Sequence, residues 1–134
     1  MVGLSTKSIY GIAAMHALYK SPRNKLMQIK EIAAITHISH GYLEQILASL
    51  KKHGFVISIR GANGGYKLAS DASSIIVLEI IEALEGELFS VPQNVGASVV
   101  LDSFWKDIQE KVRAVFHVKL SELDQAYSTY FYEI

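Results

Sequence analysis

Apolar residues recur at helical spacing along the first part of the chain. The pattern predicts a helix over residues 4–19, capped by Ser5 or Thr6. One apolar stripe of this helix consists of Ile9, Ile12, Ala13, His16 and Tyr19. The opposite side is apolar as well, so we expect the helix to be buried on more than one face.

A pair of helices is predicted next. Residues 30–36 form a short helix, and Ser39 caps a second helix that runs to about His53. The second helix turns four apolar side chains inward, namely Leu43, Ile46, Leu47 and Leu50. Gly54 stands where glycine commonly ends a helix. Two helices joined by a turn of about three residues fit the helix-turn-helix pattern.

A β-hairpin is predicted directly after this pair. Residues 55–60 and 65–69 have strand composition, and the glycine-rich residues 61–64 form the turn between them. A hairpin in this place is a wing, so the first part of the chain is predicted to be a winged helix. The glycine turn lies between two strands and lacks a following Gly-Lys-Ser/Thr, which argues against a nucleotide P-loop.

The remaining chain is predicted to be helical, with helices at 76–85 and 99–118, a loop at 87–98 between them, and a short helix at 122–130 that Ser121 caps. The predicted fold class is therefore mainly α with a small β-hairpin. Residues 1–70 form a winged helix-turn-helix domain. Residues 71–134 contain an acidic helix, the loop and a long dimerisation helix with a short terminal helix.

The long helix 99–118 carries more apolar surface than a small winged helix can cover. Its stripe includes Phe104, Trp105, Ile108, Val112 and Val115. Exposed stripes of this kind mark interfaces. We therefore predict a homodimer joined through this helix.

Charge divides the chain near Ser70. The 13 basic and 13 acidic residues cancel overall. Up to Ser70, however, nine Lys or Arg stand against two acids, a net charge of +7, and the remainder carries −7. A basic half of this kind indicates a polyanionic partner. The alternative is a chance asymmetry of solvated faces.

Several classes of function are excluded or disfavoured. The chain has no cysteine, which rules out disulfides, a thiol nucleophile, a zinc ribbon and a fully cysteine-ligated iron–sulfur cluster. No catalytic motif occurs, so we expect no enzyme activity, no cofactor and no metal; for His37 and His40, turn and DNA-facing positions are favoured over a metal pair. No apolar run would span a bilayer and no signal peptide is apparent, which predicts a cytoplasmic protein without a membrane partner.

Four segments of the chain resemble the Rrf-two family of bacterial winged-helix transcription regulators: LSTKSIYGIAAM, ISHGYLEQILASLKKHGFV, IRGANGGYKLA and IIVLEIIEALEG. The resemblance covers residues 4–127. Its most specific parts are Tyr42-Leu43-Glu44-Gln45-Ile46 and Arg60-Gly61 with Gly64-Gly65-Tyr66. It implies a homodimer that binds a partly palindromic double-stranded DNA operator, and we expect a repressor.

Two departures from the family pattern matter. Members that bind an iron–sulfur cluster carry three cysteines in the loop after the Leu-Glu-Gly segment, whereas residues 87–98 contain none. Asp102 stands roughly where those members have a histidine ligand, and one carboxylate cannot hold a cluster. We therefore expect a protein free of iron. His40-Gly41 replaces an apolar residue and a serine, so the family's base preference is not carried over.

The predicted DNA-binding face combines the helix 39–53 with the wing. Gln45 can pair with adenine, and Glu44 can accept from the cytosine amino group or pair with Lys30 or Lys51. Arg60 at the base of the wing resembles an arginine that enters a minor groove, with a plain surface arginine as the alternative. The full predicted set is Ser39, His40, Glu44, Gln45, Ser49, Lys52, Arg60, Lys7, Lys51 and Lys67.

The main alternative function is a winged-helix protein-interaction module that does not bind DNA, which the charge of +7 argues against. Three forms of control stay open. A small ligand can lie near Phe89, Val91 and Trp105; a regulatory protein partner can dock on the acidic half; or abundance alone can set the response. The acidic surface favours the protein partner.

Overall fold

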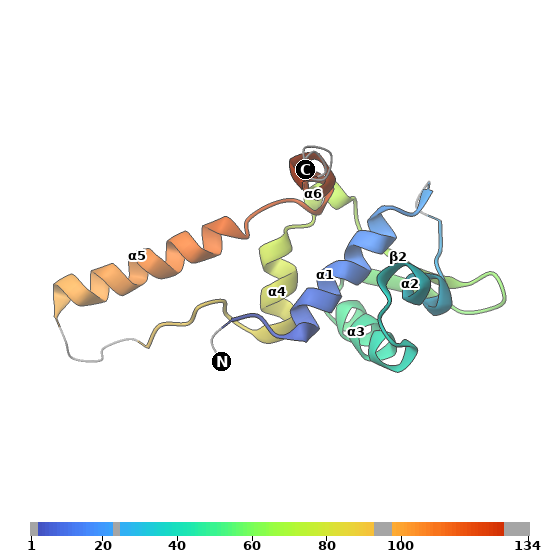
Figure 1. Ribbon diagram of the computed structural model, residues 1–134, viewed down its shortest axis with the longest axis horizontal. Coiled ribbons are helices and arrows are strands. Elements are labelled where there is room, and N and C mark those ends of the chain that lie inside the picture. The colour runs from blue at the N-terminus through green and yellow to red at the C-terminus, as the bar shows by residue number, and fades with distance from the viewer. Residues whose placement is uncertain (1–2, 23–24, 93–97, 128–134) are drawn as a thin grey trace.

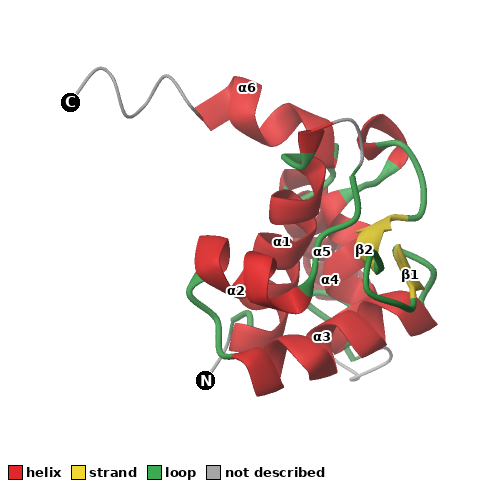
Figure 2. Cartoon of the chain, turned by 90° about the vertical axis from the view of Figure 1, so that its right-hand side faces the viewer, coloured by secondary structure: helices red, strands yellow, loops and turns green. Residues whose placement is uncertain are grey.

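The computed structural model describes residues 3–22, 25–92 and 98–127. Its regular elements are α1 (Thr6–Tyr19), α2 (Ile29–Thr36), α3 (His40–Lys52), β1 (Val56–Ile59), β2 (Gly65–Leu68), α4 (Val77–Glu85), α5 (Val99–Val115) and α6 (Leu123–Tyr127). Two single 3-10 turns precede α4 and α6. Figure 2 shows one two-stranded hairpin among helices, which confirms the predicted fold class. No helix among the described residues is long and apolar enough to cross a bilayer.

Helix α1 packs against α2, α3, α4 and β2 (Figure 1). Its buried face consists of Ser8, Gly11, Ala14, Met15, Ala17 and Leu18. At Gly11 the absence of a side chain brings α4 close, because a Cβ there would overlap the Leu84 side chain. The predicted stripe does not face the core at Ile9, because that side chain is 53% exposed. The other four residues of the stripe are half-buried, and Tyr19 donates to the Ser121 carbonyl at 3.3 Å.

The helix-turn-helix has the predicted local signals. His37 ends α2 with a left-handed φ of 61°, and the Ser39 hydroxyl oxygen accepts from the Tyr42 N–H at 3.3 Å, which caps α3. The predicted inward side chains of α3 are all buried: Leu43, Ile46, Leu47 and Leu50. A single core cluster contains these four residues together with the buried side chains of α1.

The segment after residue 70 closes the same core. Ala72, Ile75, Ile80, Leu84 and the fully buried Leu120 belong to the cluster. Backbone hydrogen bonds join the chain before and after α5, with Val77 N–H to the Val118 carbonyl at 2.8 Å and Leu120 N–H to the Ile75 carbonyl at 2.9 Å. Core packing thus crosses the predicted boundary at residue 70, and the division into two domains stays a prediction.

An ion cluster fastens α6 to α1. The Asp124 carboxylate accepts from His16 Nε2 at 2.8 Å and from Lys20 Nζ at 2.7 Å. The hydrogen bond from Lys20, followed by that from His16, lowers the pKa of Asp124, and the same bond raises the pKa of Lys20. Because the carboxyl is easier to ionise when folded, this contact stabilises the fold above the ordinary aspartate pKa and weakens as the pH falls below it.

Two predicted boundaries near the C-terminus are wrong. Helix α5 ends at Val115 rather than at residue 118, because the next residues pair with the start of α4. The terminal turn is capped by Glu122, which accepts from the Lys119 N–H at 3.1 Å, rather than by Ser121. Residues 128–130 of the predicted short helix lie outside the described residues.

Replacing Leu120 by alanine tests whether the C-terminal segment belongs to the core. We expect Leu120→Ala to lower the free energy of unfolding by about 2–5 kcal/mol, because a fully buried leucine leaves a cavity. Urea unfolding at one fixed protein concentration measures it. Ile35→Ala is the control, since that side chain is 58% exposed and its loss should cost well under about 1 kcal/mol. Equal losses in both variants would contradict the shared core.

Candidate nucleic-acid interface

The exposed side of α3 is polar and faces away from the core. His40, Glu44, Gln45 and Lys52 are exposed on it, and Ser49 is half-buried. Glu44 Oε1 lies 3.8 Å from His40 Nε2, with both side chains more than half exposed. In the described part of the chain Glu44 thus pairs with His40 rather than with Lys30 or Lys51. An exposed pair of this kind is weak, so both groups stay available to a ligand.

A groove of about 550 Å³ lies between α2, α3 and the hairpin. Its basic and titratable lining residues come from three separate elements: Lys30 from α2, His40 and Lys51 from α3, and Arg60 from the end of β1. The complete lining is Gln28, Ile29, Lys30, His40, Lys51, Ser58, Ile59, Arg60, Gly61, Gly64, Gly65 and Tyr66. None of these is acidic, so the groove favours an anionic ligand. We call it the wing groove.

Close backbone contacts fix the hairpin beside α2. Met27 and Tyr66 exchange two backbone hydrogen bonds at 2.9 and 2.8 Å, which adds a bridge to the edge of β2. Gly65 permits this approach, because a Cβ there would lie 2.6 Å from the Met27 carbonyl oxygen and its φ is 149°. The turn itself closes through the Gly64 N–H, which donates to the Gly61 carbonyl at 3.0 Å.

The structure brings only part of the predicted set together. His40, Lys51 and Arg60 line the wing groove, and Ser39, Glu44, Gln45, Ser49 and Lys52 belong to the adjoining helix α3 and its cap. Lys67 lines a different hollow with Ser21, Ile57 and Asp71, because neighbouring residues of a strand face opposite sides. A role in DNA binding stays a prediction for every member.

Lys7 lies on the exposed first turn of α1, beside Glu85 at the end of α4. Burial alone would raise the pKa of the Glu85 carboxyl. Hydrogen bonds, including one from the Ser5 N–H at 2.6 Å, and the charge of Lys7 outweigh that effect and lower the pKa. Lys7 thus has an acidic neighbour and does not line the wing groove.

Among the lining residues that sequence reasoning did not place at the interface are Gln28 and Lys30. Both stand at the start of α2, and Gln28 Nε2 donates to the Ala62 carbonyl at 3.2 Å across 34 residues. Their place on the groove depends on the pairing of Met27 with Tyr66, which the tertiary fold sets and the local sequence does not.

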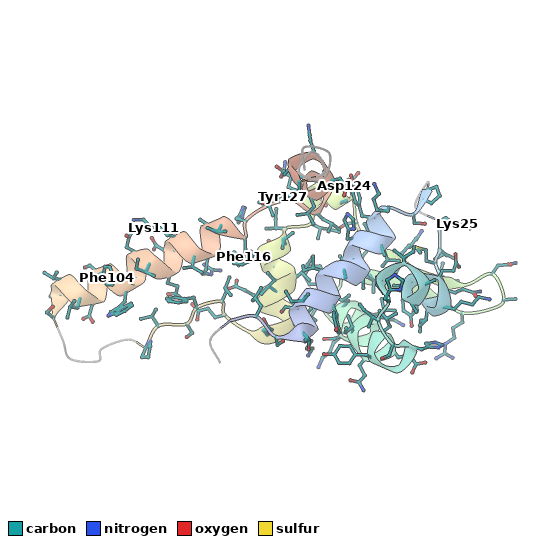
Figure 3. The ribbon with its side chains drawn as sticks, viewed as in Figure 1. Lys25, Phe104, Lys111, Phe116, Asp124 and Tyr127 are labelled. Atoms are coloured by element: carbon teal, nitrogen blue, oxygen red, sulfur yellow. The ribbon has the colours of Figure 1, made fainter. Side chains whose placement is uncertain are left out.

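Helix α5 forms the second uncovered surface. It projects from the rest of the protein, and its side chains, Phe104 and Lys111 among them, stand clear of the other helices (Figure 3). Phe104 is 48%, Trp105 42% and Val115 72% exposed, while Ile108 and Val112 are half-buried. Phe104 and Trp105 pack edge to face with ring centroids 4.9 Å apart. All five predicted dimer residues therefore lie on a helix that has no fully buried residue in the described part of the chain.

Two polar contacts tie α5 to the segment before it. Arg113 donates to both carboxylate oxygens of Glu82, at 2.7 and 2.9 Å, and Gln109 donates to Glu87 at 2.7 Å. The hydrogen bonds from Arg113 lower the pKa of Glu82, and the same contact raises the pKa of Arg113. The pair is therefore fully charged at neutral pH, and its bidentate geometry restrains the direction of α5.

The described residues offer no candidate metal site. Across the described ranges no three His, Cys, Asp or Glu side chains lie close enough together to hold a metal ion. Residues 93–97, which precede α5 in the sequence, are Gln, Asn, Val, Gly and Ala, and the chain has no cysteine. The residues present therefore do not fit an iron–sulfur cluster.

Comparison with known proteins identifies the family. Residues 4–134 match the profile of Rrf2, an iron-dependent transcriptional regulator family. The chain is 41% identical over 97 residues to the HTH-type transcriptional regulator IscR of Cereibacter sphaeroides, covering 71% of this chain and 63% of that protein. It is 36% identical over 112 residues to the HTH-type transcriptional regulator CymR of Bacillus subtilis, covering 84% and 81%.

Comparison with a solved structure supports the same family. The structure of CymR, the global cysteine regulator of B. subtilis, superposes with a TM-score of 0.84 at 34% identity and covers 94% of this chain and 98% of that one. The fold, the hairpin wing and the family profile agree, and the predicted resemblance is confirmed. The chain belongs to the Rrf2 (Rrf-two) family of helix-turn-helix transcription regulators.

Proposed function

We propose that this protein is a sequence-specific DNA-binding repressor that acts as a homodimer without an iron–sulfur cluster. The observation that carries the proposal is the wing groove, where Lys30, Lys51 and Arg60 from separate elements meet beside the polar face of α3. Phosphate neutralisation by such groups supplies most of the affinity for DNA. A module that binds only proteins would not require three basic side chains in the wing groove.

In the proposed complex α3 enters the major groove. Its 13 residues span about 20 Å, enough to cross several base edges. Gln45 pairs with adenine, and Glu44 exchanges its weak contact with His40 for a cytosine amino group. Arg60 enters the adjacent minor groove from the wing, and Lys30 and Lys51 contact phosphates between the two.

The proposed dimer joins two copies through α5. The five predicted dimer residues share one side of α5, and a two-fold axis would place that side against its own copy. Burying two exposed aromatic side chains from each copy favours association. The two α3 helices then read half-sites about one helical turn of DNA apart, roughly 34 Å.

For control, we propose a regulatory protein partner at the acidic half. Glu79 is exposed on α4 and Glu87 lies just beyond it, beside the junction with α5. These carboxylates would attract a partner protein with a basic surface, whereas they would repel the phosphates of DNA. A small ligand near Phe89 and Trp105 is the second possibility, and both side chains are partly exposed.

Two substitutions test the DNA contacts. Duplexes selected by affinity from the protein's own genome supply the operator. Arg60→Ala should weaken operator binding by about 1–3 kcal/mol, and Gln45→Ala should relax base preference more than it weakens non-specific binding. Fluorescence anisotropy measures both. Lys106→Ala on α5 removes an equal charge outside the wing groove and should leave affinity unchanged.

Contrary outcomes are clear-cut. Unchanged operator binding in both variants would show that the assigned face is wrong. Failure to select any duplex would favour the protein-interaction module instead.

The dimer is tested by a charge on the apolar side of α5. We expect the wild-type protein to sediment as a dimer at micromolar concentration, and Ile108→Glu to sediment as a monomer because a carboxylate cannot be buried unpaired. Ala114→Glu adds the same charge at an exposed position outside the predicted apolar stripe and should leave the dimer intact. A monomeric wild-type protein would overturn the dimer proposal.

The cluster-free state is tested by metal analysis. Protein purified without air should contain no stoichiometric iron and show no visible absorption, because the described residues offer no ligand set. Operator affinity should be the same before and after treatment with an iron chelator. One or more iron atoms per chain would contradict this part of the proposal.

A further inference from the structure

One side-chain hydrogen bond joins the wing turn to the helix-turn-helix. Gln28 Nε2 lies 3.2 Å from the Ala62 carbonyl oxygen. A carbonyl can only accept, so the amide nitrogen of Gln28 must face it and donate. Ala62 stands two residues after Arg60, within the turn that connects β1 to β2.

Hydrogen bonds fix the backbone of Gln28 beside the core. Its N–H donates to Glu31 Oε1 at 3.1 Å, and its carbonyl accepts from the Ile32 N–H at 3.1 Å. Ile32 is fully buried, and the preceding residue, Met27, pairs with Tyr66 through two backbone hydrogen bonds. The backbone of Gln28 is therefore fixed on both sides, and its side chain presents a donor at a set position.

The wing turn, residues 61–64, is restrained by fewer contacts than the backbone of Gln28. Gly61 has a φ of 117° and no neighbour within 4 Å of where a Cβ would lie, so it sits in open space. Within the turn, the Gly64 N–H donates to the Gly61 carbonyl. The bond from Gln28 to the Ala62 carbonyl adds a contact from outside the hairpin.

We propose that Gln28 is a positioning residue: it holds the wing turn at Ala62 and thereby orients Arg60 in the wing groove. The inference rests on the proposed function, in which Arg60 contacts DNA. A turn that is fixed before binding loses less conformational freedom when DNA arrives, so the contact made by Arg60 is stronger. Gln28 acts through Arg60 and need not touch DNA itself.

The variant Gln28→Met tests the inference, because it keeps the length of the side chain and removes the donor. In DNA-free protein we expect faster amide hydrogen exchange at Gly64 and at the other turn residues 61–63. Operator binding should weaken about three- to tenfold, the range of one neutral hydrogen bond. Gln125→Met on α6 makes the same change on an exposed helix elsewhere and should alter neither quantity.

A double-mutant cycle separates positioning from direct contact. If Gln28 acts through Arg60, Gln28→Met should cause no further loss in the Arg60→Ala background. A full additional loss there would mean that Gln28 contacts DNA directly and would overturn the inference. Unchanged exchange in the wing turn would also overturn it.

The experiments distinguish failure of the proposed function from failure of the inference about Gln28. If Arg60→Ala leaves operator binding unchanged, the proposed role of Arg60 in DNA binding falls, and with it the part of the inference that concerns affinity. The exchange measurement needs no DNA and still decides whether Gln28 holds the turn. Urea unfolding shows whether the Gln28→Met protein folds. If it does not, Gln28→Glu replaces it in the exchange measurement, because glutamate keeps the shape of the side chain and likewise removes the donor.

Discussion

The pairing of Met27 with Tyr66 is the contact on which the candidate interface depends. It brings the start of α2 against β2, and so places residues about 35 positions apart in the sequence on one groove. The pairing is possible because Gly65 has no side chain to meet the Met27 carbonyl. Without it, α3 would still present its polar face, but Arg60 would have no fixed relation to Lys30.

A second constraint links the two oppositely charged parts of the chain. The core cluster contains side chains from α1, α3 and β1 together with Leu84 and Leu120, so the basic and acidic parts share one interior. Asp124 adds a charged contact to His16 and Lys20 on α1. The separation of charge is therefore a property of the surface of one continuous fold and does not mark a break in its core.

The sequence predicts best what local interactions decide. The four inward residues of α3, its Ser39 cap and the presence of the two hairpin strands follow from spacing and turn chemistry. Errors occur where distant segments decide the outcome. Ile9 is exposed because α6 covers only the far end of its stripe, and α5 stops at Val115 because the following residues pair with α4. Gln28 and Lys30 were missed for the same reason.

The direction of α5 is the remaining link between fold and proposed function. In a two-fold dimer joined through α5, the angle between α5 and the rest of the chain sets the distance between the two α3 helices. That angle is restrained by the ion pair of Glu82 with Arg113, by Gln109 with Glu87, and by the backbone bonds of residues 116–120 to the start of α4. Residues 87–92 adjoin these contacts, so a ligand or partner bound there would change the polar contacts and, through them, the operator spacing. Such a signal would need no metal cluster, for which the described residues offer no ligand set.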